Sequence, residues 1–154
     1  MPADARRTDL AEASIDAAVS TNTLEHIDPD DIASILVELR RVLRPGGVCS
    51  FAVDYHDHYA DSDPTIGPLH FLQFDDPQWR RWNCPFQYQN RLRHPDYVVL
   101  FQEAGFVVEG EERTTVERPP GLVLAERFQQ YCALDVATVH GWFVLRSPGP
   151  EPET

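Results

Sequence analysis

The sequence predicts an α/β protein whose sheet has parallel strands, helices between them and an antiparallel last strand. Short apolar runs typical of buried strands alternate with segments whose apolar residues recur at helical spacing. Proline and glycine mark the boundaries between these segments. The resulting order, strand–helix–strand–helix–strand and a final strand, favours a sheet whose crossovers are made by helices.

The first half of the chain contains a strand, a helix and a second strand. Residues 15–20 are small and apolar, which favours a buried strand. Asp28 can cap a helix that begins at Pro29, and acidic side chains follow in its first turn. The apolar face of this helix consists of Ile32, Ile35, Leu36, Leu39 and Leu43. We expect the turn at 45–47 to end the helix and residues 48–53 to form the next strand.

The second half is expected to add two helices and two strands. A helix over 95–104 would be capped by Gly105, and a strand would run from 106 to 116. Residues 122–132 have a helical pattern, and residues 139–145 form the last apolar run. We expect this last strand to be antiparallel and to lie at the edge of the sheet.

Composition excludes several classes of function. The 154 residues carry a net charge of −12, from 25 acidic and 13 basic side chains, so neither nucleic acid nor an anionic membrane is an expected partner. Every basic residue is arginine, which excludes lysine-based Schiff-base or phosphate-loop chemistry. No apolar run approaches the roughly 18 residues of a membrane span and no signal peptide is recognisable, so we expect a cytoplasmic protein. The three cysteines form no CxxC motif or disulfide framework.

Several sequence blocks occur in an order that resembles a known enzyme family. Ser-Thr-Asn-Thr-Leu-Glu-His at 20–26 and Leu-Arg-Pro-Gly-Gly at 43–47 bracket the first helix. Val-Asp-Tyr-His-Asp-His-Tyr follows at 53–59, and Asn-Arg-Leu-Arg at 90–93. Together they resemble the middle and end of a class I S-adenosylmethionine (SAM)-dependent methyltransferase of type 11. The resemblance implies the second half of a Rossmann-like sheet and SAM as cofactor.

The sequence departs from this family at its beginning. Members hold SAM with a glycine-rich turn after their first strand, because only glycine lets the backbone approach the ligand closely. No GxG is present here, since the glycines stand at 46, 47, 67, 105, 110, 121, 141 and 149. We therefore expect residues 1–146 to be a partial methyltransferase domain that lacks the cofactor-binding half, and residues 147–154 to be a disordered tail.

The resemblance also implies cofactor-binding positions. Asp4 with Ala5 resembles the acidic position that accepts a hydrogen bond from the adenine amino group; a solvated aspartate is the alternative. Ser20, Thr21 and Asn22 match the segment that passes beneath the sulfonium.

The loop after the second strand corresponds to the acceptor side of the family's site. Tyr55 belongs to this loop, and His56 or His58 could take a proton from an acceptor hydroxyl. A polar loop that braces the site is the alternative reading. A metal site built from these histidines with Asp61 or Asp63 is a weaker one, and no metal is predicted. Glu25 either braces a turn or contacts the cofactor.

Residues 54–93 form an aromatic-rich insertion. It could be a lid over the acceptor, with Trp79 or Trp82 stacking on a flat or sugar-like substrate, but a small separate core is favoured. Arg91 and Arg93 could bind an anionic group of the acceptor, although surface ion pairs are the simpler expectation.

These observations lead to one principal hypothesis and one alternative. The chain is expected to be a SAM-dependent methyltransferase of a small-molecule oxygen or nitrogen acceptor, weak or inactive without a complementing N-terminal half. Alternatively, it is a non-catalytic remnant or interaction module that pairs with itself or another chain through the strand at 15–20.

Overall fold

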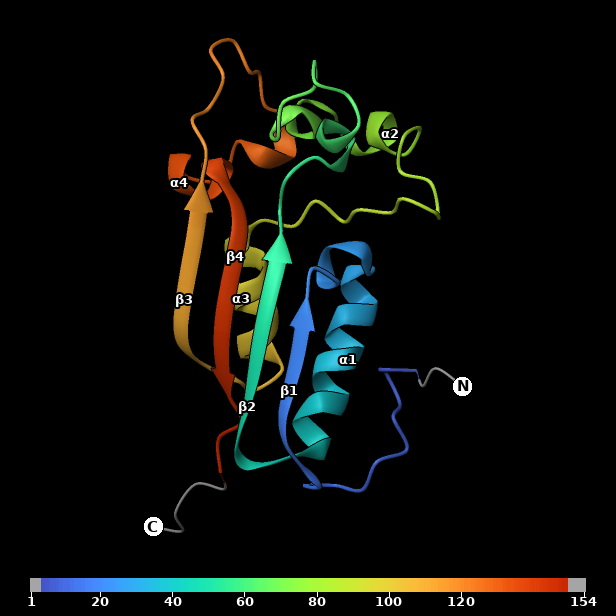
Figure 1. Ribbon diagram of the computed structural model, residues 1–154, viewed down its shortest axis with the longest axis vertical. Helices are drawn as coiled ribbons and strands as arrows, with labels where there is room; N and C mark the ends of the chain where they lie inside the picture. The colour runs from blue at the N-terminus through green and yellow to red at the C-terminus, as the bar shows by residue number, and fades with distance from the viewer. Residues whose placement is uncertain (1–3, 150–154) are drawn as a thin grey trace.

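The computed structural model describes residues 4–149, which form a four-stranded sheet with two long helices (Figure 1). The strands are β1 (Ile15–Thr21), β2 (Leu43–Asp54), β3 (Val107–Thr115) and β4 (Thr138–Arg146). The α-helices are α1 (Pro29–Val42), α2 (Asp76–Trp79), α3 (His94–Glu103) and α4 (Ala133–Ala137). Four short 3₁₀ turns occur at Leu24–His26, His58–Asp61, His70–Gln73 and Glu126–Phe128. None of the helices in this part of the chain is long and apolar enough to cross a membrane.

The strand order is β1-β2-β4-β3. β1 and β2 pair in parallel, and β4 is antiparallel to both of its neighbours, so β1, β2 and β3 all point the same way. The predicted fold class is confirmed, but the expected edge position of the last strand is wrong. β4 carries Phe143 and Leu145, which are fully buried, whereas β3 carries three glutamates and one arginine. Charged side chains suit a solvent-facing edge, so β3 takes that place and β4 lies inside the sheet.

Helix α1 begins as predicted and ends one residue earlier than its apolar pattern indicates. The Asp28 side chain accepts a hydrogen bond from the amide of Asp30, with Pro29 at the first helical position. The helix ends at Val42, and Leu43 already belongs to β2. The Pro-Gly-Gly turn therefore lies within the first residues of the strand, because strand pairing of Leu43 with Ile15 competes with a further helical turn.

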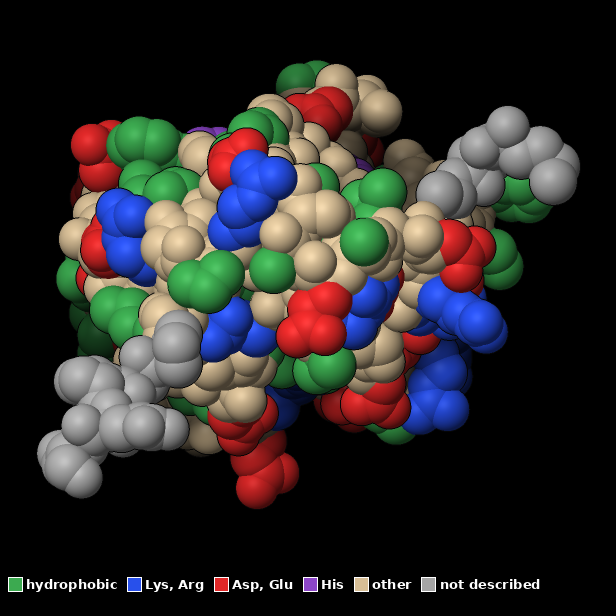
Figure 2. All heavy atoms as spheres, turned by 90° about the horizontal axis from the view of Figure 1, so that it is seen from below, with side chains coloured by type: hydrophobic (Ala, Val, Ile, Leu, Met, Phe, Trp, Pro, Cys, Tyr) green, Lys and Arg blue, Asp and Glu red, His purple; other side chains and the backbone are tan. Residues whose placement is uncertain are grey.

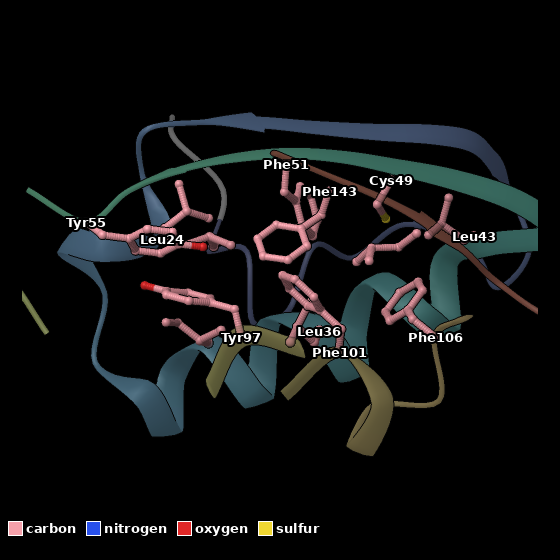
Figure 3. Packing of buried hydrophobic residues seen from close by; sticks show 13 residues of the cluster. Leu24, Leu36, Leu43, Cys49, Phe51, Tyr55, Tyr97, Phe101, Phe106 and Phe143 are labelled. Atoms are coloured by element: carbon pink, nitrogen blue, oxygen red, sulfur yellow. The ribbon is translucent and has the colours of Figure 1, made fainter. Parts of the chain in front are cut away.

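The main core lies between one face of the sheet and helices α1 and α3. Figure 3 shows Phe51 and Phe143 of the sheet packing against Leu36 of α1 and Phe101 of α3. The rings of Phe101 and Phe143 meet edge to face with centroids 5.0 Å apart. No helix of residues 4–149 covers the opposite face of the sheet, where Val19 is 74% exposed (Figure 1).

The insertion packs into a second core. Phe71 and Trp79 are buried there together with Phe128 and Val136 from the segment before β4. The predicted small core is thus confirmed, although Phe86 stays fully exposed. The predicted helix over 122–132 is wrong: this stretch contains only the 3₁₀ turn at Glu126–Phe128, because Phe128 must turn inward to reach the second core.

Both ends of the described chain are attached to the body. Ser147 is buried and donates its amide to the carbonyl of Gly47, so the predicted disordered tail does not begin at 147; residues 150–154 lie outside the described part. At the other end, Thr8 donates two hydrogen bonds to Glu38 of α1, and Arg41 reaches the carbonyl of Leu10. The segment before β1 therefore runs along α1, and β1 remains the edge of the sheet.

Candidate functional site

The loops that follow β1 and β2 meet at the carboxyl end of these parallel strands, at the top of Figure 1. The first loop supplies Glu25 and His26, and the second supplies His56 and His58. The ring centroids of His26 and His58 are 4.9 Å apart, and those of His56 and His58 are 4.8 Å apart. Figure 2 shows the opposite end of the molecule, where acidic and basic side chains are interspersed and histidine is seen only at the far rim.

His56 is held between two carboxylates. Its Nδ1 lies 2.5 Å from Oδ1 of Asp54, and its Nε2 lies 3.1 Å from Oδ1 of Asp61. The hydrogen bond to Asp54 is the main reason why the pKa of His56 is raised to about 9. Both ring nitrogens are therefore engaged, and the imidazolium form is favoured near neutral pH.

His58 is held less tightly than His56. Its Nε2 lies 3.9 Å from Oδ2 of Asp54, which is too far for a hydrogen bond. Burial lowers the pKa of His58, so the neutral ring with an available lone pair is favoured. Of the two predicted catalytic histidines, His58 has the nitrogen that is free to accept a proton or a ligand.

Glu25 is the most buried member of the cluster at these strand ends. Its side chain is 2% exposed, and neither carboxylate oxygen has a hydrogen-bond partner among residues 4–149. Its Oε1 lies 3.9 Å from Nε2 of His26, whose Nδ1 is 2.9 Å from the carbonyl of Tyr88. Burial raises the pKa of Glu25.

The predicted cofactor-side residues are only partly brought together. Ala5 and Ser20 both line an apolar cavity of about 210 Å³ between β1 and α1. Asn22 has a positive φ of 47° and donates its amide to Ala52 of β2. Such left-handed backbone is uncommon for residues other than glycine and often occurs at functional sites. Thr21 is the last residue of β1.

Asp4 lies in an exposed turn and binds a neighbouring arginine. Its carboxylate accepts hydrogen bonds of 2.8 to 3.2 Å from the Arg6 side chain. These bonds lower the pKa of Asp4 to about 2. Arg6 in turn binds Asp31 of α1, so Asp4 is tied to α1 through an arginine.

The three predicted substrate residues have different surroundings. Tyr55 is buried in the main core beside Tyr97, which corrects its assignment to the open acceptor side. Trp79 belongs to the second core and also lines a cavity of about 120 Å³ whose other walls are Asp57, Tyr59, Ile66, His70, Phe74 and Trp82. Arg91 stacks over the Trp79 ring at 5.0 Å, and its side chain is occupied within the insertion.

The expectation of a surface ion pair is wrong for Arg93, whereas Arg91 does pair with an acid, Asp76, but from a buried position. Arg91 is buried and donates to the carbonyls of Phe71 and Phe74 as well as to Asp76. Arg93 is completely buried, and its guanidinium donates only to backbone carbonyls. Both arginines hold loops together, because loops without regular pairing leave carbonyl groups that need donors.

The sequence reasoning missed His26 and Asp54, and it did not settle the role of Glu25. All three lie at or just after the ends of adjacent parallel strands, which is where α/β proteins gather ligands. Their position at strand ends was the available signal. Their proximity to His58 depends on how the two loops fold, which the sequence pattern does not report.

Comparison with known proteins identifies the fold. Residues 1–51 match a family model described as a methyltransferase domain. Over this segment the chain is therefore similar in sequence to a methyltransferase domain. The resemblance inferred from the sequence is thereby confirmed, and no curated protein matches the chain.

Solved structures of methyltransferases have the same fold along nearly the whole chain. A proposed methyltransferase from Bacillus halodurans C-125 has a TM-score of 0.59 at 14% identity, covering 95% of this chain and 76% of that one. A SAM-dependent methyltransferase from Methanosarcina mazei has a TM-score of 0.54 at 16% identity, covering 94% and 64%. Phosphoethanolamine N-methyltransferase 2 of Haemonchus contortus was solved with phosphomonomethylethanolamine and S-adenosylhomocysteine. It has a TM-score of 0.58 at 14% identity, covering 95% of this chain and 36% of that one. At these identities the similarity establishes the methyltransferase fold.

Proposed function

We propose that this chain forms the acceptor side of a SAM-dependent methyltransferase that methylates an oxygen or nitrogen of a small molecule. The observation that carries the proposal is the meeting of the β1 and β2 loops, which brings Asn22 and the histidine cluster to one end of the methyltransferase fold. In such a reaction the protein positions the acceptor, excludes water and assists proton loss.

SAM is the proposed cofactor and supplies the activated methyl group. The described residues fit one side of it. Ser20, Thr21 and Asn22 would pass beneath the sulfonium, and Ala5 and Ser20 line the apolar cavity beside β1. Asp4 would accept a hydrogen bond from the adenine amino group, but Arg6, which now binds its carboxylate, would first have to move away. The glycine turn that would hold the methionine moiety has no counterpart in the sequence.

The two histidines have distinct proposed roles. His58 has a ring nitrogen that is not engaged in a hydrogen bond to Asp54 and would accept the proton of an acceptor hydroxyl. His56, fixed by Asp54 and Asp61, would position that wall of the site. The cavity at Trp79 is the proposed place for an apolar or aromatic part of the acceptor.

Cofactor binding by the chain alone is the decisive measurement. Each hydrogen bond lost to a polar ligand group costs about 1–3 kcal/mol, so a site without its glycine turn should bind SAM more weakly than micromolar. Calorimetric titration with SAM tests this, and micromolar or tighter binding would show that another surface replaces the missing contacts.

A complementing polypeptide that carries the glycine turn should restore activity. In that assembly Asn22→Ala should weaken SAM binding, while Ser34→Ala on the exposed side of α1 should not. His58→Ala should lower kcat more than it raises the KM for SAM. Normal turnover by the His58 variant would show that the loop has a structural role only and that His58 does not accept the proton.

The alternative function is an interaction module. β1 is an edge strand, Val19 on the uncovered sheet face is 74% exposed, and an unprotected edge favours pairing with a second chain. Sedimentation should then detect a dimer or larger species that Val19→Lys weakens. Val123→Lys is the matched control, since Val123 is equally exposed but lies outside the sheet. A sharply melting monomer would contradict this alternative.

A further inference from the structure

The buried carboxylate of Glu25 has no partner that explains its position. It is 2% exposed, and both oxygens are without a hydrogen bond among the residues described. A carboxylate buried in this way costs free energy unless it is paired, hydrogen-bonded or bound to a cation. Its Oε1 faces the Nε2 of His26 at 3.9 Å.

His26 is oriented as metal-binding histidines are. Its Nδ1 lies 2.9 Å from the carbonyl of Tyr88, and a carbonyl can only accept, so Nδ1 carries the proton. The lone pair then resides on Nε2, the atom that faces Glu25. A backbone carbonyl that fixes the tautomer of a histidine is the usual outer contact of a metal ligand.

One further donor, from His58, completes the arrangement. Donor atoms of Glu25, His26 and His58 all lie within 4.8 Å of one another, as do those of Asp54, His56 and His58. His58 belongs to both groups, but no set of four donors among the described residues meets this distance, so Glu25, His26 and His58 form the candidate site. Since His56 already uses both nitrogens on Asp54 and Asp61, it is excluded as a ligand and instead holds Asp54 in place.

We propose that Glu25, His26 and His58 form a binding site for a divalent transition-metal cation of the Zn²⁺ or Co²⁺ type. Two imidazoles and one carboxylate suit such cations, whereas Mg²⁺ and Ca²⁺ prefer oxygen donors alone. Metal–ligand distances of about 2.0–2.2 Å in a tetrahedron separate neighbouring donors by roughly 3.3 Å. The separation of 3.9 Å between His26 and Glu25 needs only a small contraction, and the donor of His58 lies within 4.8 Å of both.

This site goes beyond the proposed methyl transfer and does not depend on it. Asp63 takes no part, because its carboxylate accepts hydrogen bonds from Thr65. A cation at this place would lie at the acceptor side of the strand ends, and an oxygen bound to it would ionise more readily. In the metal-bound form His58 would be a ligand, and the cation would replace it in promoting loss of the acceptor proton.

Metal titration of the purified chain tests the proposal without SAM. Zn²⁺ binding followed by calorimetry should saturate at one ion per chain, and Co²⁺ should develop the visible absorption of a four- or five-coordinate complex. Loss of even an outer contact lowers metal affinity by about 10–100-fold, so Glu25→Gln and His58→Ala should each lower it at least that much. His70→Ala is the matched control, because His70 lies beside Asp57 and outside the cluster. The affinity of this variant for Zn²⁺ should equal that of the unmodified chain.

Two results would overturn the site. One is a Co²⁺ spectrum that stays that of the aqueous ion; the other is Zn²⁺ affinity that Glu25→Gln leaves unchanged. Because Gln has nearly the shape of Glu, this variant should stay folded, and circular dichroism verifies it. A chain that binds Zn²⁺ but shows no methyl transfer with its complementing half supports the metal site and rejects the proposed function. A chain that transfers the methyl group but binds no Zn²⁺ supports the proposed function and rejects the metal site.

Discussion

Arg93 and Glu25 are both ionisable and both buried, yet their surroundings are opposite. Arg93 is fully enclosed, and its guanidinium donates to the carbonyls of Tyr55, Asp135, Val136 and Thr138. Burial lowers its pKa to about 10, so it stays charged at neutral pH. Glu25 is nearly as buried and has no hydrogen-bond partner in the described chain. Hydrogen bonds offset the cost of burying Arg93, whereas the cost of burying the Glu25 carboxylate is not offset, and the proposed cation would supply the missing partner.

The largest expected change in stability comes from replacing Arg93, the buried charge whose hydrogen bonds are satisfied. Arg93→Met removes the donors that connect the end of β2 with α4 and the start of β4, and it leaves buried carbonyls without partners. We expect the free energy of unfolding in urea to fall by about 3–5 kcal/mol. Arg118→Met, at an exposed arginine that binds one carbonyl, should change it little. Similar losses in both variants would refute the structural role of Arg93.

A substitution of Arg91 tests whether the hydrogen bonds of a buried arginine also stabilise the second core. Its guanidinium binds the carbonyls of Phe71 and Phe74 and stacks on Trp79. Arg91→Met keeps apolar contact with the Trp79 ring but loses the guanidinium stacking and the hydrogen bonds, so stability should fall by about 1–3 kcal/mol. Limited proteolysis should then cut first within residues 54–93. A cleavage pattern identical to that of the unmodified chain would show that the bonds are dispensable.

Glu25→Gln should raise the free energy of unfolding, whereas the two arginine substitutions lower it. Replacing an unpartnered buried carboxylate by a neutral amide lowers the cost of burial, so the metal-free protein should gain about 1 kcal/mol or more in unfolding free energy. Glu38→Gln is the matched control. Glu38 is also largely buried, but its carboxylate binds Thr8 and Arg41, and its replacement should destabilise. Destabilisation by both changes would mean that Glu25 is paired in solution.

His94 is an intermediate case, since it is buried with one carboxylate partner. Its Nε2 lies 3.0 Å from Glu111, and burial lowers its pKa below the ordinary 6.5. The unfolded chain therefore binds the proton first, so the contribution of neutral His94 is complete above pH 6.5 and is lost as the pH falls through its folded-state value. The pH slope of stability below 6.5 should be smaller in His94→Gln, by at most about 1.4 kcal/mol per pH unit. Equal slopes would show that other groups control acid sensitivity.

Much of the fold was predictable because local patterns report local contacts. The cap at Asp28, the stripe that buries Leu36 and the strand at 15–20 follow from side-chain chemistry within one element. The helix wrongly predicted over 122–132 marks the limit of this reasoning. There Phe128 packs into the distant second core, and that tertiary contact outweighs the local periodicity.

The sequence by itself determined the α/β fold class, the order of the four strands along the chain and the end of the sheet at which Asn22 and His58 lie. Only the tertiary structure placed β4 between β2 and β3, buried Arg93 among carbonyls and brought Glu25 and His26 against His58. The reason is physical. Helical and strand periodicity record which face of an element is buried, whereas strand neighbours and side-chain partners depend on contacts between segments far apart in the chain.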